Sequence, residues 1–203
     1  MKLNLQHLLT IRKEDEEEYQ KRVNHLSKSL LSQIDNLTAI VDAFSAFSQM
    51  PKANAESFDM GQLVDEVVGL FRHHQGVSVE HKESKDSMLT VFADRNQFVS
   101  VLNNLIKNAI QACEQKNTDV DVLVQVGREE KYVRVDVIDQ GIGIAEEDKA
   151  NVFVPNFTTK STGSGLGLAI ARQIVENTEG SIGFTSKDGE GSTFYYLVPI
   201  QDG

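Results

Sequence analysis

Four short segments occur in a fixed order between residues 103 and 170 of this chain: NNLIKNA, DQGIG, a Phe-rich stretch ending in FTTK, and GSGLGLAI. Each segment alone is a weak signal, because asparagine pairs, Asp-Gly-type turns and glycine loops are common. The four together are hard to reach by chance. A fold for this chain has to explain why they occur in one stretch.

The first fifty residues have the pattern of helices. A stripe of apolar residues steps by three and four positions, as on one face of a long amphipathic helix: Tyr19, Val23, Leu26, Leu30, Ile34, Leu37, Val41 and Phe44. A shorter apolar run precedes it, beyond the acidic segment RKEDEEE. We therefore expect a helical hairpin over residues 1–50, with a seam of the kind that packs in coiled coils and bundles.

Pro51 and the polar stretch around it end this pattern and predict a linker over residues 51–57. Residues 58–203 then alternate between helical and strand patterns and form the second predicted domain. The predicted helices are 61–72, 94–115 and 166–177, and the predicted strands are 77–83, 88–93, 120–128, 130–138, 181–186 and 193–199. Helices with a mostly antiparallel sheet predict the α+β class, as a two-layer α/β sandwich preceded by the hairpin.

Composition excludes several classes of protein. The net charge of −10 argues against nucleic acid as a partner, since phosphate backbones require a basic surface. No stretch approaches the roughly 20 apolar residues of a membrane span, and no signal peptide is evident. The single cysteine, Cys113, is typical of a reducing cytoplasm.

The predicted helix over 94–115 carries a polar face besides its core face. Asn104, Asn108 and Gln111 fall together at i, i+4 and i+7. Asparagine is a poor residue inside a helix, and its amide oxygen suits Mg²⁺ that also holds phosphates and waters. A simply solvated face is the alternative. Lys107, beside them, either meets phosphate or is solvated.

An alternating strand leads into Asp139, which Gly141 and Gly143 follow. A carboxylate at a strand end, next to a turn without side chains, can accept a hydrogen bond from an exocyclic amine. That chemistry suits adenine and disfavours guanine. An ordinary turn is the alternative.

Gly163, Gly165 and Gly167 open an amphipathic helix. Bare backbone amides before a helix N-terminus bind phosphates. Neither G-x-G-x-x-G nor the P-loop pattern is present, which excludes the two commonest nucleotide motifs. A flexible loop at the helix start is the alternative.

The polar segment between these glycines contains Phe153 and Phe157. Apolar anchors in such a loop predict a lid that closes over phosphates, although core anchoring explains them equally well. We expect Lys160 and the hydroxyls of Thr158 and Thr159 to touch the terminal phosphate. Thr193, at a strand start, could support Asp139.

With these residues in place, the chain resembles the C-terminal half of a two-component sensor histidine kinase of the nitrogen-regulation type, within the gyrase, Hsp90 and MutL superfamily. NNLIKNAIQA is similar to the N box, DQGIGI to the first glycine box, FVPNFTTK to the F box and GSGLGLAI to the second glycine box. The resemblance implies ATP and Mg²⁺ as cofactors, with Asn108 as the metal ligand. It implies ATP contacts at Asn104, Lys107, Asn108, Asp139, Gly141, Gly143, Thr158, Thr159, Lys160, Gly163, Gly165, Leu166, Gly167 and Thr193.

The resemblance also bears on the reaction. Hydrolysing members of the superfamily carry a glutamate one turn before the Mg²⁺ asparagine, and this chain has Asn104 there. Without a base to activate water, the γ-phosphate is kept for transfer to a protein acceptor. We therefore expect an ATP-dependent protein histidine kinase rather than an ATPase.

One part of the resemblance is missing. The acceptor of such kinases lies in a segment like H-E-[IL]-[KR]-N-P-L-[ST], and none of the five histidines fits it. We expect no catalytic acceptor within the chain, which then could not phosphorylate itself; His7 or His25 as acceptor is the alternative. The implied partners are a response-regulator receiver domain and a second copy, with any membrane contact made by upstream segments. A non-catalytic nucleotide-sensing module and an anti-sigma-type serine kinase are the rival functions.

Overall fold

The computed structural model describes residues 54–71, 76–82, 89–117, 119–160 and 165–201. From the first fifty residues it describes positions 20, 23, 24, 27–29 and 34, all of them helical. The rest of the predicted hairpin, and Gly163, lie outside the described residues.

A five-stranded sheet forms one layer of the molecule. Its strands are β2 (Val77–Lys82), β4 (Val120–Glu129), β5 (Tyr132–Asp139), β6 (Ser181–Lys187) and β7 (Gly191–Pro199). Their order is β2-β4-β5-β7-β6, with β2 and β4 parallel and every other neighbouring pair antiparallel. The predicted mostly antiparallel sheet is confirmed.

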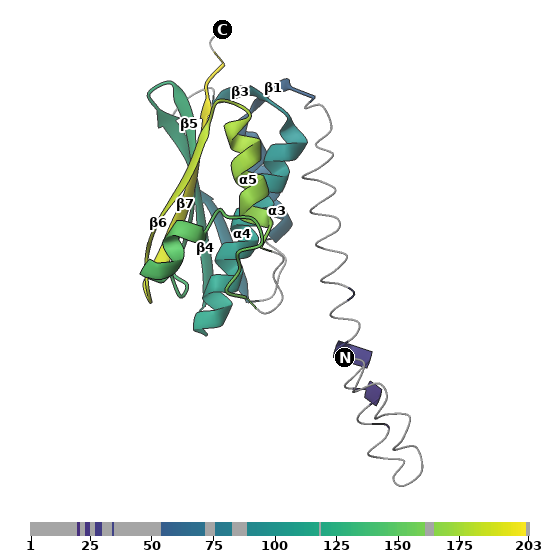
Figure 1. Cartoon of the computed structure of the whole chain (residues 1–203). Coiled ribbons are helices and arrows are strands. Elements are labelled where there is room, and N and C mark those ends of the chain that lie inside the picture. Colours follow the sequence, from purple (N-terminus) through teal and green to yellow (C-terminus); the bar gives the residue numbers. More distant parts are fainter. Residues whose placement is uncertain are drawn as a thin grey trace.

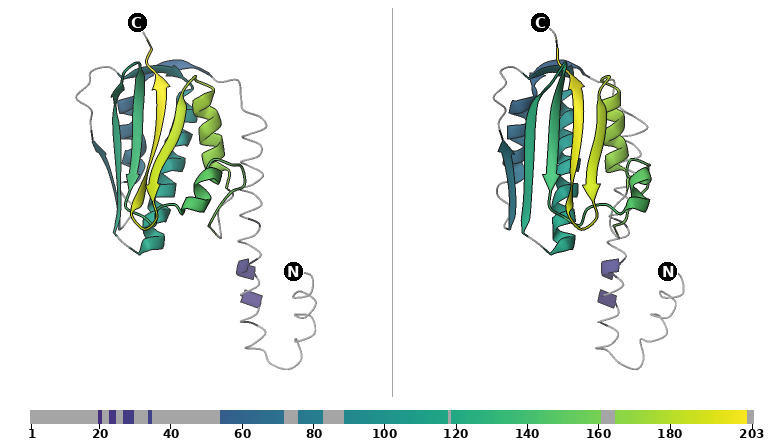
Figure 2. Two further views of the ribbon diagram at one scale, coloured as in Figure 1. Left: turned by 60° about the vertical axis from the view of Figure 1, so that its left-hand side comes forward. Right: turned by 90° about the vertical axis from the view of Figure 1, so that its left-hand side faces the viewer.

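Three helices form the second layer: α3 (Met60–Phe71), α4 (Arg95–Lys116) and α5 (Gly167–Glu176). All three lie on the same face of the sheet (Figure 1). Figure 2 shows them behind the sheet when its other face is turned to the viewer. The predicted two-layer α/β sandwich, a sheet packed on helices, is therefore confirmed.

The core lies between these two layers. Alternate residues of β4 and β5 face the helices, so that Val124 and Val135 are fully buried, as is Leu105 of α4. The rings of Phe98 and Tyr196 join the layers, with centroids 5.7 Å apart. Each large apolar side chain buried here contributes about 1.5–3 kcal/mol, which fixes α4 against the sheet.

Both ends of α4 are capped. The carboxylate of Asp94 accepts hydrogen bonds from the backbone N–H groups of Asn96 (3.0 Å) and Gln97 (3.1 Å). Asn117 ends the helix in the left-handed conformation, with φ of 56°. These caps satisfy terminal backbone groups and fix the helix start near the predicted position.

Two short elements were not predicted. Strand β1 (Glu56–Asp59) pairs antiparallel with β3 (Thr90–Ala93), and its first two residues fall in the segment predicted as a linker. Four residues are too few to show an alternating pattern, and the partner strand is distant in sequence. The 3₁₀ helix η1 (Glu146–Asn151) lies in the segment predicted as a loop, with three acidic residues in its first turn.

Candidate functional site

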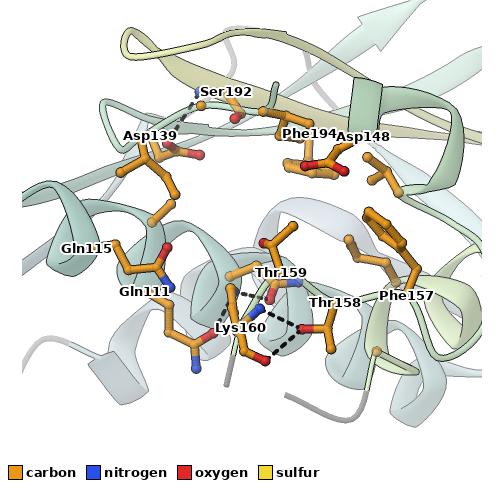
Figure 3. Close-up of a pocket in the computed structure, with 18 of the residues that line it drawn as sticks. Gln111, Gln115, Asp139, Asp148, Phe157, Thr158, Thr159, Lys160, Ser192 and Phe194 are labelled. Atoms are coloured by element: carbon orange, nitrogen blue, oxygen red, sulfur yellow. Dashed lines mark hydrogen bonds between the residues drawn. The ribbon is translucent and has the colours of Figure 1, made fainter. Parts of the chain in front are cut away.

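A cavity of about 430 Å³ opens between α4, the ends of β5 and β7, the segment after η1 and the start of α5. Ten of the predicted site residues line it: Asn104, Lys107, Asn108, Asp139, Gly143, Thr158, Thr159, Lys160, Gly165 and Gly167. Figure 3 shows this cavity, with Asp139 and Ser192 on one side and Lys160 on the other. Gly141, Leu166 and Thr193 do not line it.

The polar face of α4 forms one wall. Asn104, Asn108 and Gln111 all line the cavity, as their spacing predicts. Gln115 lines it as well, four residues beyond Gln111, and was missed although it continues the same stripe. Asn104 of α4 lies close to the start of α5, since a Cβ added to Gly167 would lie 3.2 Å from the Asn104 Oδ1.

Asp139 forms the opposite wall at the end of β5 and is only 5% exposed. Its Oδ1 accepts hydrogen bonds from the backbone N–H groups of Gly141 (2.8 Å) and Ser192 (3.3 Å). Within the described part of the chain, no group donates to Oδ2. The carboxylate is thus oriented by the backbone through one oxygen and keeps the other as an acceptor at the cavity wall.

Burial raises the pKa of the Asp139 carboxyl above its ordinary value. The hydrogen bonds from Gly141 and Ser192 and the positive charges of Lys116 and Lys160 oppose this shift. A buried carboxyl that lines a cavity and has a shifted pKa is a candidate binding group.

Gly141 has a packing role instead of a contact with the cavity. A Cβ at this position would lie 2.5 Å from the carbonyl carbon of Ala112. The close approach lets the next residue, Ile142, donate its N–H to the Ala112 carbonyl at 3.2 Å. The DQGIG turn is thereby fixed to α4.

Ser192, and not Thr193, takes the position expected beside Asp139. Side chains alternate along β7, and Ser192 and Phe194 both line the cavity, so Thr193 faces the other side of the sheet. The Ser192 Oγ lies 2.9 Å from Ser186 Oγ, which accepts from the Ile144 N–H at 2.9 Å. The prediction for Thr193 is therefore displaced by one residue, which in a strand reverses the facing side.

Lys160 crosses the cavity from the segment after η1 to α4. Its Nζ donates to Asn108 Oδ1 at 3.0 Å and to Gln111 Oε1 at 2.6 Å. Burial lowers the pKa of this ammonium, while the charge of Asp139 raises it. Thr158 accepts the backbone N–H of Lys160 at 3.1 Å, which orders the short turn between them.

The amide oxygens on the α4 wall suit a divalent cation that takes its other ligands from waters and phosphate oxygens. No group of three or more His, Cys, Asp or Glu residues that could hold a metal occurs in the described ranges. Asn108 Oδ1 already faces a positive charge, the Lys160 ammonium. Hard, neutral amide oxygens of this kind suit Mg²⁺ that keeps waters and phosphate oxygens as its other ligands.

The two Phe residues of the predicted lid have different roles. The Phe153 ring packs against Phe184 and Phe194, with centroids 5.9 and 6.4 Å away. Phe157 lines the cavity. Core anchoring, the alternative that the sequence left open, therefore accounts for Phe153 but not for Phe157.

Comparison with protein families matches residues 93–202 to the family described as histidine kinase-, DNA gyrase B-, and HSP90-like ATPase. Nitrogen regulation protein NtrY of Azorhizobium caulinodans is 33% identical over 158 residues, covering 76% of this chain and 20% of that protein. Sensor histidine kinase ZraS of Escherichia coli K12 is 29% identical over 180 residues, covering 87% and 38%. The chain thus spans two fifths or less of the length of these relatives.

Solved structures agree with this match. The catalytic domain of histidine kinase ThkA aligns with a TM-score of 0.63 and 32% identity, covering 72% of this chain and 96% of that one. ThkA in complex with the response regulator protein TrrA aligns with a TM-score of 0.72 and 27% identity, covering 98% of this chain and 57% of that one.

Within the described residues of this chain, no helix is long and apolar enough to cross a membrane.

Proposed function

The chain belongs to the family of histidine kinase-, DNA gyrase B-, and HSP90-like ATPases, and we propose that it is the kinase core of a two-component sensor histidine kinase. In this proposal it binds Mg²⁺–ATP and provides the γ-phosphoryl group for a histidine. The observation that carries the proposal is the pair of opposite walls. One wall has the buried carboxylate of Asp139 on β5, which accepts a hydrogen bond from β7, and the other has a stripe of amides on α4 with Lys160.

The base is recognised at Asp139. Its Oδ2 accepts a hydrogen bond from the exocyclic amine of adenine, while Gly141 and Ser192 hold Oδ1. Guanine presents a carbonyl oxygen at the same ring position, which the carboxylate repels. The phosphates then extend toward the start of α5, where Gly165 and Gly167 line the cavity without side chains and Lys160 adds positive charge.

Asn108, which lines the cavity, would hold the metal through its amide oxygen. A Mg²⁺ ion held there would supply positive charge that neutralises the phosphates during transfer. Asn104 carries a neutral amide and cannot take a proton from water. Because Asn104 stands where a glutamate would activate water, transfer of the γ-phosphoryl group is favoured over hydrolysis of ATP.

The acceptor is a histidine in a segment like H-E-[IL], outside the described domain. His81, the one histidine that the structure describes, has a side chain only 2% exposed and bonded through Nδ1 to Asp65 at 2.6 Å. It is closed to a nucleotide. The phosphoryl group then passes to an aspartate of a receiver domain, an inference supported by the solved complex of histidine kinase ThkA with the response regulator protein TrrA.

The apolar stripe of residues 19–44 supports a dimer made by the N-terminal helices, and the composition supports a cytoplasmic location for this part of the protein. Size-exclusion chromatography with light scattering, at several protein concentrations, tests the dimer.

Incubation with γ-labelled ATP and Mg²⁺ tests the transfer, with the chain alone and with an added helical segment containing H-E-[IL]-[KR]-N-P-L. We expect acid-labile, base-stable label only when the segment is present, and no label with Asp139→Asn or Asn108→Ala. Acid-stable label would instead indicate a serine kinase. Nucleotide binding without label under any condition would indicate a non-catalytic module, and label on the chain alone would place the acceptor at His7 or His25.

A further inference from the structure

Two amide oxygens on successive turns of α4 converge on a single positive atom. Lys160 Nζ lies 2.6 Å from Gln111 Oε1 and 3.0 Å from Asn108 Oδ1. Figure 3 shows Lys160 beside Gln111. The two amides are three residues apart on the helix, so their side chains share one face. The lysine comes from a segment 49 residues further along the chain than Gln111.

We infer that Gln111 and Asn108 form one cation cradle on α4, and that the Lys160 ammonium and the metal of Mg²⁺–ATP occupy this cradle in turn. Gln111 is thereby a second protein ligand of the metal, besides Asn108. The inference rests on the proposed function, because it concerns the metal that accompanies ATP.

The Lys160 ammonium and a metal ion exclude each other because both are positively charged and both require the same oxygen atoms. A primary ammonium offers three donors and no acceptor, so it binds the same oxygen lone pairs that a metal ion requires. Two cations cannot share these oxygens in a cavity that is partly closed to water, because little solvent remains to screen their repulsion. While Lys160 stays on the cradle, a metal ion cannot bind there.

The nucleotide changes this balance. Its phosphates attract the Lys160 ammonium, which lies in the same cavity, and they also bring metal ligands of their own. Lys160 therefore moves from the amides to the phosphates as the metal takes its place. The cradle accepts metal together with nucleotide and resists metal alone.

Metal binding in the absence of nucleotide tests this exchange. Mn²⁺ is the probe, because its free concentration is read directly by electron paramagnetic resonance. The site is defined as the Mn²⁺ binding that Asn108→Ala removes, which separates it from the many surface carboxylates of an acidic chain. If Lys160 holds the cradle for nine tenths of the time, Lys160→Met should tighten Mn²⁺ binding at this site about tenfold.

Lys107→Met is the matched control. Lys107 lines the same cavity, one residue before Asn108, but makes no hydrogen bond to the two amides. Its removal takes away an equal charge and leaves the cradle covered. An equal gain of Mn²⁺ affinity in Lys107→Met and Lys160→Met would overturn the exchange, because loss of any nearby positive charge would then explain the result.

Gln111→Leu tests the second ligand. Combined with Lys160→Met, it should remove most of the gained Mn²⁺ affinity, whereas unchanged affinity would overturn the role of Gln111. Circular dichroism and thermal melting show whether each variant is folded. Binding of fluorescent ADP in the presence of Mg²⁺ is measured in parallel. If wild type does not bind it, the proposed function fails; if wild type binds it while Lys160→Met leaves Mn²⁺ affinity unchanged, only this inference fails.

Discussion

The backbone N–H of Ser192 donates a hydrogen bond of 3.3 Å to Oδ1 of Asp139, although the two residues are 53 positions apart in the sequence. They are direct partners in the antiparallel β5–β7 pair. The register of the sheet therefore sets the orientation of the carboxylate. Anything that shifts β7 by one residue would also disturb the proposed adenine contact.

Replacing Asp139 by Asn should weaken nucleotide binding and leave the domain folded. The Asn amide oxygen can still accept from Gly141 and Ser192, but its NH₂ group then faces the cavity and meets the amine of adenine donor to donor. Loss of a hydrogen bond to a charged acceptor costs about 1.5–3 kcal/mol, so we expect about ten- to hundredfold weaker binding. Titration of a fluorescent ATP analogue measures this change.

The same variant should unfold no more easily than wild type without nucleotide. Burial raises the pKa of Asp139 in the folded state, so ionising it at neutral pH costs stability that an uncharged Asn does not. A lower urea midpoint for Asp139→Asn than for wild type would contradict this account.

Ionisation of Asp139 should make adenosine affinity and folding stability change in opposite directions as the pH rises. Its folded pKa is raised, so affinity for adenosine is full above that pKa and falls as the pH drops through it. Adenosine is the ligand of choice because it has no phosphate to titrate. The stability that the protonated carboxyl contributes is full below the unfolded pKa and is lost as the pH rises through the folded one.

Urea unfolding of wild type and Asp139→Asn at a series of pH values checks the second sign. The advantage of the variant should grow as the pH rises through the folded pKa. A constant difference across the series would mean that Asp139 titrates alike in both states.

Ser192 and Thr193 provide a test of which residue supports the site. Ser192→Ala removes the hydroxyl that lies 2.9 Å from Ser186 Oγ and lines the cavity. A neutral hydrogen bond is worth about 0.5–1.5 kcal/mol, which predicts about two- to tenfold weaker adenine-nucleotide binding. Thr193→Ala, on the other side of the same strand, should bind like wild type. The opposite result, with Thr193→Ala the weaker binder, would restore the sequence-based assignment.

The periodicity of apolar residues predicted the long helices and strands. It did not predict the short elements or the contacts that depend on strand register. The helix over 94–115 and the strand pair around 130 are long and strongly patterned, and they occur as α4 and the β4–β5 hairpin. Thr193 was selected as a hydroxyl residue at a predicted strand start, whereas the facing side of a strand residue depends on the exact position of the pleat. The contact of Lys160 with Gln111 joins a loop to a helix, and no local pattern records it.

Gly141 and Gly69 should respond in opposite directions to the same substitution. A methyl group on Gly141 would lie 2.5 Å from the carbonyl carbon and from the Cβ of Ala112, so the DQGIG turn must move away from α4. Such overpacking costs about 1–3 kcal/mol. A Cβ on Gly69, within α3, would meet nothing within 4 Å, and alanine there should add about 0.5–1 kcal/mol because it restricts the unfolded chain.

Urea unfolding measures both variants, and nucleotide titration gives the second readout. Because the Gly141 N–H also donates to Asp139 Oδ1, a displaced turn loosens the carboxylate. Gly141→Ala should therefore bind nucleotide more weakly than its folded fraction accounts for, while Gly69→Ala binds like wild type. Normal affinity in the folded fraction of Gly141→Ala would show that the close approach to α4 serves packing alone.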